Sequence, residues 1–141
     1  MTGLPETWSV PVVRADFDHD RAWQWIVREI GAATEEGFGA DVEFVENRTL
    51  AGLDGLAIAA RYLPAYPWEY RHPVLFVADL VAMAAPDHAL LVVNLNTGVD
   101  AGPFRTVPRQ VQAIQNNLSL ANMDYVEFER AANPDGVFRG F

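Results

Sequence analysis

Three polar residues stand where apolar, strand-like segments end. Asp16, Asp79 and Asn94 close the segments VVRAD, VLFVAD and LLVVN, respectively. Ligands of open parallel sheets bind outside the carboxyl ends of the strands, so these side chains are candidates for acid–base catalysis or for orienting a ligand. Asp18 follows two residues after Asp16, and carboxylates within about 4–6 Å of one another need a cation or a shared proton.

A structural role competes with the catalytic role for each carboxylate. A strand-terminal aspartate commonly caps the turn that follows it, and Asp18 or Asp20 is expected to cap the next helix by accepting its unpaired amide hydrogens. The chain has no lysine, a usual companion of acidic phosphoryl-transfer sites. Its 3 histidines show no metal-ligand spacing. We therefore expect neither a bound metal nor another cofactor.

The loop PAYPWEYRHP is a second group of residues with binding chemistry. Tyr66, Trp68, Tyr70 and His72 alternate in it, so an extended backbone places these flat, partly polar rings on one side. Such rings supply a large contact area at low cost in side-chain entropy, and long loops often carry binding sites. The loop is a candidate surface for a protein partner or a ligand. The alternative is that the rings fold back and cover the edge of the sheet.

The asparagine-rich run NNLSLANMD, residues 116–124, is the third candidate. Asparagine is poor inside helices and good at bridging backbone groups in irregular turns, so Asn117 and Asn122 are expected to join two helix ends. Leu118, Leu120 and Met123 would anchor this joint against the core. The alternative is that the two amides bind a ligand or a partner.

The composition removes several classes of function. The chain has no cysteine, which excludes a thiol nucleophile, a thiolate metal site and a disulfide framework. Its 10 lysine-plus-arginine positions are all arginine, which excludes Schiff-base and P-loop lysine chemistry. No G-x-S-x-G or G-x-G-x-x-G motif occurs. The net charge of −9 repels nucleic acid and favours a cationic ligand or a basic protein partner.

The same sequence features bear on location. The amino terminus MTGLPETWSV has neither the basic region nor the long apolar stretch of a secretory signal. Apolar runs such as VLFVA are far shorter than the roughly 20 residues of a membrane span. A cytoplasmic protein with no membrane partner and no nucleic-acid partner is expected, and its oligomeric state is left open.

The elements that would position these residues alternate between strands and helices. A helix over residues 20–33 carries apolar side chains at i, i+3, i+4 and i+7, and the runs VLFVA and LLVV are typical of interior strands covered on both faces. The other predicted elements are strands at 10–15, 41–46 (an edge strand) and 104–107, helices within 47–62 and 108–115, and a last helix that begins with the capping-box pair Asp124 and Glu127.

This order predicts a single α/β domain over residues 1–141, with residues 1–9 as a loose arm. The expected architecture is a three-layer sandwich with a mostly parallel or mixed sheet of four to five strands. The link between VLFVA and LLVV is short for a parallel crossover, so the relative direction of these two strands is left open.

The segments NNLSLANMD and DGVFRGF, together with VVRADF, VLFVAD and LLVVNL, give the chain a family likeness. Along nearly its whole length it resembles a family of small acidic bacterial proteins known only as a domain of unknown function. The resemblance implies a stand-alone domain with this strand order, and it implies no activity.

Two classes of function fit these observations. The first is a binding or accessory protein that docks to another macromolecule, with its acidic amino-terminal half and its aromatic loop as the surface. The second is a small enzyme or metabolite-binding domain, with Asp16 and Asp79 as acid–base or metal-binding groups and Asn94 or Asn117 orienting the ligand. Convergence of Asp16, Asp79 and Asn94 on an open cavity would favour the second class. Engagement of these side chains in turns would favour the first.

Overall fold

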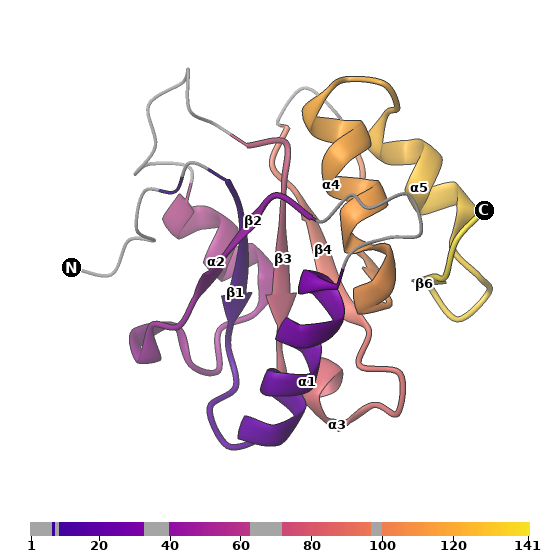
Figure 1. Ribbon diagram of the computed structural model, residues 1–141. Helices are drawn as coiled ribbons and strands as arrows, with labels where there is room; N and C mark the ends of the chain where they lie inside the picture. The colour runs from indigo at the N-terminus through magenta and orange to yellow at the C-terminus, as the bar shows by residue number, and fades with distance from the viewer. Residues whose placement is uncertain (1–6, 8, 33–39, 63–71, 97–99) are drawn as a thin grey trace.

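The computed structural model describes residue 7 and residues 9–32, 40–62, 72–96 and 100–141. Within them, a 6-stranded mixed sheet has the order β2-β1-β3-β4-β5-β6 and lies between two layers of helices (Figure 1). The strands are β1 (Val10–Arg14), β2 (Val42–Val45), β3 (Val74–Ala78), β4 (Leu90–Asn94), β5 (Phe104–Thr106) and β6 (Val137–Phe138).

The strands are parallel with one exception. β1 pairs in parallel with both β2 and β3, and β5 pairs in parallel with β6. β4 is antiparallel to both of its neighbours, β3 and β5. The segment between β3 and β4 holds only the 5-residue helix α3 (Leu80–Ala84), which is too short to carry the chain back across the sheet. β4 therefore returns beside β3 in the opposite direction.

Helices cover the two faces of the sheet unequally. The other helices are α1 (Asp20–Gly31), η1 (Arg48–Leu50), α2 (Gly55–Tyr62), η3 (Pro108–Gln110), α4 (Val111–Ser119) and α5 (Tyr125–Ala131). The larger core lies under α1, α3, α4 and α5, whereas η1 and α2 cover the smaller core on the opposite face (Figure 1). The three-layer α/β sandwich is thus confirmed, with β3 and β4 as adjacent interior strands.

Several local predictions hold. Trp23, Ile26 and Ile30 form the buried stripe of α1, and β2 is an edge strand. Asp124 and Glu127 make the predicted capping box at the start of α5. None of the helices in the described ranges is long and apolar enough to cross a membrane.

Other predictions are wrong in instructive ways. The sheet has 6 strands rather than four to five, because the turn before Val137 delivers a 2-residue strand beside β5. The helix expected within 47–62 is divided into η1 and α2, with Gly52 at a φ of 77° between them. This left-handed backbone suits glycine and ends a helix. Asp18 and Asp20 do not cap α1: the N-cap is His19, which makes no side-chain cap bond.

Candidate functional site

A hollow opens where the parallel strands β1 and β3 end. The chain leaves β1 toward β2 on one side and leaves β3 toward β4 on the other, which is the switch point where open α/β sheets bind ligands. We call this cavity of about 560 Å³ the carboxyl-edge hollow. Its lining includes four aspartates and a rim of larger apolar side chains: Asp16, Asp18, Asp54, Asp79, Phe17, Leu53, Leu80 and Val81, with Arg48.

Asp16 lies in this hollow but is engaged by its own loop. Its side chain is 8% exposed, and its Oδ1 accepts the main-chain N–H of Asp18 at 2.7 Å. The Nδ1 of His19 lies 3.1 Å from its Oδ2. These contacts let the carboxylate close the turn between β1 and α1. They also supply the polar partners that a buried charge requires. The i, i+3 spacing of Asp16 and His19 is the sequence signal that could have predicted this pair.

Asp79 is engaged more completely. Its Oδ1 accepts the N–H of Ala82 at 3.0 Å, which makes it the N-cap of α3. The guanidinium of Arg105 donates to both carboxylate oxygens, at 3.0 Å and 2.7 Å. A third Arg105 hydrogen bond, to the carbonyl of Ala89, holds the arginine over the α3–β4 turn. This bidentate pair neutralises Asp79 and ties α3 to β5.

Asn94 does not join the two aspartates. β4 runs antiparallel to β3 and Asn94 pairs with Val74, so the asparagine lies at the opposite edge of the sheet. There its side chain makes hydrogen bonds with the backbone N–H and C=O of Asn96. Asn94 therefore does not share the hollow with Asp16 and Asp79, and the three side chains do not converge on one cavity. In the described ranges, no group of three or more histidine or acidic side chains is placed to hold a metal ion.

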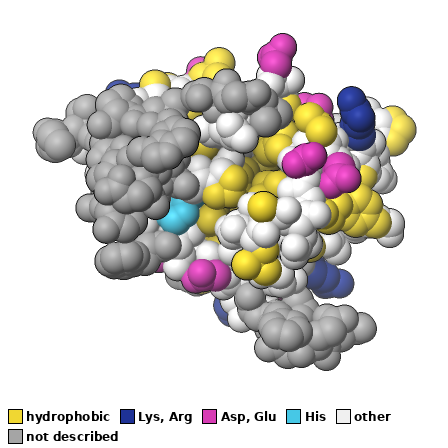
Figure 2. Space-filling model, turned by 90° about the horizontal axis from the view of Figure 1, so that it is seen from above, with side chains coloured by type: hydrophobic (Ala, Val, Ile, Leu, Met, Phe, Trp, Pro, Cys, Tyr) yellow, Lys and Arg dark blue, Asp and Glu magenta, His cyan; other side chains and the backbone are white. Residues whose placement is uncertain are grey.

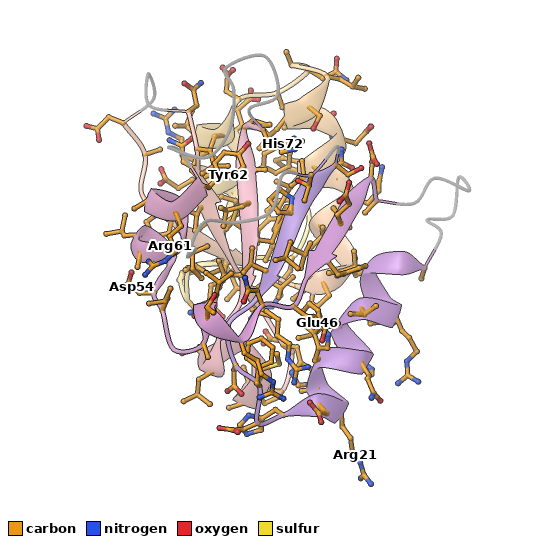
Figure 3. The ribbon with its side chains drawn as sticks, turned by 90° about the vertical axis from the view of Figure 1, so that its left-hand side faces the viewer. Arg21, Glu46, Asp54, Arg61, Tyr62 and His72 are labelled. Carbon is orange, nitrogen blue, oxygen red and sulfur yellow. The ribbon has the colours of Figure 1, made fainter. Side chains whose placement is uncertain are left out.

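His72 also lies toward that opposite edge, and it is half-buried rather than displayed. Its Nε2 is 3.0 Å from the carbonyl oxygen of Thr7, and its main-chain N–H donates to the hydroxyl of Tyr62 (Figure 3). Figure 2 shows this edge from above, where the described side chains are mainly hydrophobic or uncharged. Tyr66, Trp68 and Tyr70, the other predicted contact residues, lie outside the described residues.

The asparagine segment is closed by its main chain. The backbone carbonyl of Asn117 accepts the N–H of Asn122 at 2.9 Å, and Leu118 and Met123 pack against the larger core. The Asn117 side chain donates to the carbonyl of Ala113 within α4, at 2.8 Å. Asn122 is exposed. The expectation that both amides bridge two helix ends is therefore wrong, although the segment does join α4 to α5.

A second cavity, which the sequence patterns did not predict, lies between α1 and β2. We call it the Arg14 groove; its volume is about 650 Å³ and its lining is Arg14, Asp20, Trp23, Gln24, Val27, Arg28, Phe44 and Glu46. The Arg14 side chain is 6% exposed and pairs with Asp20 at 2.6 Å and Glu46 at 3.1 Å. Its Nε donates to the carbonyl of Asp16, and the ring of Phe17 stacks 4.8 Å from the guanidinium carbon.

Electrostatics in the groove follow from this burial. A desolvated guanidinium needs anionic partners, and here two largely exposed carboxylates reach inward to supply them. The hydrogen bond and charge of Arg14 lower the pKa of Asp20 from its ordinary value. An arginine on the core face of an otherwise apolar strand is the sequence signal that points to this network.

The fold and its two cavities define a class: a three-layer α/β/α domain with a mixed sheet, an acidic hollow at the switch point and an arginine-centred groove beside an edge strand. The model of the family described as Domain of unknown function (DUF6924) matches residues 9–141. The chain belongs to this family. No match was found among curated proteins.

Proposed function

We propose that this domain is a binding module that docks to another protein through the carboxyl-edge hollow. The observation that carries the proposal is the apolar rim of that hollow. Leu80 and Val81 are 59% and 55% exposed at the start of α3, beside the aspartates. Adjoining exposed aliphatic side chains rimmed by polar groups are typical of a protein-contact surface.

The state of the strand-end carboxylates supports docking over catalysis. The negative charge of Asp79 is compensated by the ion pair with Arg105, and the carboxylate of Asp16 faces its own loop and His19. A general acid or base must have a proton-transfer position open to the substrate. Both carboxylates instead hold the backbone turns that present the rim, which is a structural task.

Charge supports a partner with basic side chains. Asp18 and Asp54 are exposed in the hollow, and neither forms an ion pair within the described part of the chain. Arg48, the cation in the lining, lies over the ring of Phe17 at 5.0 Å. With a net charge of −9, the whole domain attracts a basic surface and speeds its association.

A small enzyme or metabolite-binding domain is the second candidate, and the Asp16–His19 pair favours it. A carboxylate 3.1 Å from one imidazole nitrogen orients the ring and supports proton transfer at the other nitrogen. His19 is not among the residues that line the hollow, so a substrate there would have to meet it at the rim.

The experiment is selection of peptides from a random displayed library, followed by binding measurements on purified variants. We expect the selected peptides to combine arginine or lysine with apolar residues. The double variant Leu80→Ser/Val81→Ser should weaken binding by about tenfold or more, since partial burial of two aliphatic side chains is worth about 1–3 kcal/mol. Asp54→Asn keeps the hydrogen bond to the N–H of Ala57 and tests charge alone.

The matched controls are exposed residues outside the hollow. Leu120 is 62% exposed at the end of α4, and Asp100 is exposed before β5. Leu120→Ser and Asp100→Asn should leave the affinity unchanged. Equal binding by wild type and by the double rim variant would disprove docking at the hollow. Loss of a small-molecule activity in His19→Gln, with peptide binding absent, would establish the second candidate instead.

A further inference from the structure

On its outer side, β2 has no neighbouring strand within the part of the chain that the structure describes. The main-chain N–H of Ala15, just after β1, donates to the carbonyl of Ala78 on β3. Main-chain groups of successive strand residues point to alternate sides, so the odd-numbered residues of β1 face β3 and the even-numbered ones face β2. In the parallel register that pairs Val12 with Phe44, the N–H and C=O groups of Val42 and Phe44 then point away from β1. Among the strands of the described residues, none pairs with β2 on that side.

Beside this edge, the Arg14 groove provides a place for side chains. Phe44 is 36% exposed and packs edge-on against the ring of Trp23, with centroids 5.8 Å apart. Val27 adds an aliphatic wall to the same groove. Successive side chains of an added strand alternate between faces, so every second one would enter the groove over these apolar groups.

The charge along this edge favours a particular charge on any strand that is added to it. Asp41 and Glu43 flank the start of β2, and Glu46 and Asp20 lie in the groove. Figure 3 shows Glu46 between β2 and α1. The edge and the groove together hold more carboxylates than arginines, so a net negative charge remains: Asp20, Asp41, Glu43 and Glu46 against Arg14 and Arg28. A second copy of the chain would place the same acids against each other, which is unfavourable, whereas a basic strand complements them.

We propose that the edge of β2 receives an extended basic segment of the partner protein as an added strand. The inference rests on the proposed function, that the domain docks a protein, and it names the form and charge of what docks. The two surfaces are contiguous through Phe17, which lines the hollow and stacks on Arg14 beside the groove. One partner can therefore contact the rim at Leu80 and Val81 while its strand pairs with β2.

The test uses a synthetic peptide of alternating arginine and valine, with amide hydrogen exchange of the wild-type domain followed by NMR. Strand addition should slow exchange at Val42 and Phe44 by roughly tenfold, since each outward amide gains a hydrogen bond. Glu43 and Val45 already donate toward β1 and should not change, which makes them internal controls. A peptide with glutamate in place of arginine should have no effect.

The outcomes separate the two proposals. Unchanged exchange at Val42 and Phe44, or equal slowing along all of β2, would overturn strand addition. If library-selected peptides still bind and depend on Leu80 and Val81, docking at the hollow stands without it. Slowing confined to the outward amides, reversed by salt, supports the added basic strand.

Discussion

Asp79 provides the sharpest test of whether the strand-end carboxylates are structural. Its side chain has two roles, N-cap of α3 and ion-pair partner of Arg105. Asparagine caps a helix about as well as aspartate, so Asp79→Asn removes the ion pair and keeps the cap. Asp79→Ala removes both. The two variants therefore separate the contributions of the two roles to the free energy of unfolding.

The magnitudes follow from the geometry. Hydrogen bonds to a charged group are worth about 1.5–3 kcal/mol when buried, and exposed ion pairs about 0–1 kcal/mol. Both side chains of this pair are 22% exposed, between these limits. We therefore expect Asp79→Asn to cost about 1–2 kcal/mol, and loss of the cap to bring Asp79→Ala to about 2–3 kcal/mol. The urea midpoint of the alanine variant should fall by about 1 M.

A double-mutant cycle with Arg105→Met isolates the pair. We expect a coupling energy of about 1–2 kcal/mol between Asp79→Asn and Arg105→Met, because the two side chains are in direct contact. Asp100→Asn, a charge change on an exposed residue, should leave the midpoint within error. A wild-type midpoint for Asp79→Asn, with no coupling to Arg105, would refute the structural reading. The carboxylate would then be available for binding or catalysis.

Further predictions concern stability, titration and exchange. In urea denaturation, Asn122→Ala should change the free energy of unfolding by less than about 0.5 kcal/mol. Asn117→Ala should lower it by about 1 kcal/mol, because one hydrogen bond is lost. A large loss of stability in Asn122→Ala would restore the bridging role of this side chain. The hydrogen bond from Arg139 lowers the pKa of Asp135. The ion pair should therefore stabilise the folded domain above pH 3.8, and this stabilisation should be lost as the pH falls through the lowered pKa. Carboxyl NMR should place its midpoint below 3.8, and Arg139→Gln should return it toward 3.8. Burial raises the pKa of Tyr125, so wild-type stability should fall above pH 10.0 and Tyr125→Phe should lack that fall. In hydrogen exchange, the β3 and β4 amides should be among the slowest, and fast exchange in either strand would contradict their interior position.

Features encoded within a few residues could be predicted from the sequence. The apolar runs of β3 and β4 mark strands buried on both faces, since only an interior strand has no polar side to turn to water. The stripe of α1 and the capping box at Asp124 and Glu127 depend on spacings of three and four residues. In each case the interacting groups lie on one helix or one strand. Their spacing alone determines that they meet.

The site depended on contacts between distant segments. Asp79 meets Arg105 and Arg14 meets Glu46 because strand pairing brings these residues together, and no local spacing selects one arginine among 10. The edge on which Asn94 lies was likewise decided by β4 running antiparallel to β3. An apolar strand buries the same side chains whichever way it runs, so its pattern carries no direction. The direction of β4 comes from the short connection through α3 and from the packing of the whole sheet, and these determine which polar side chains share the hollow.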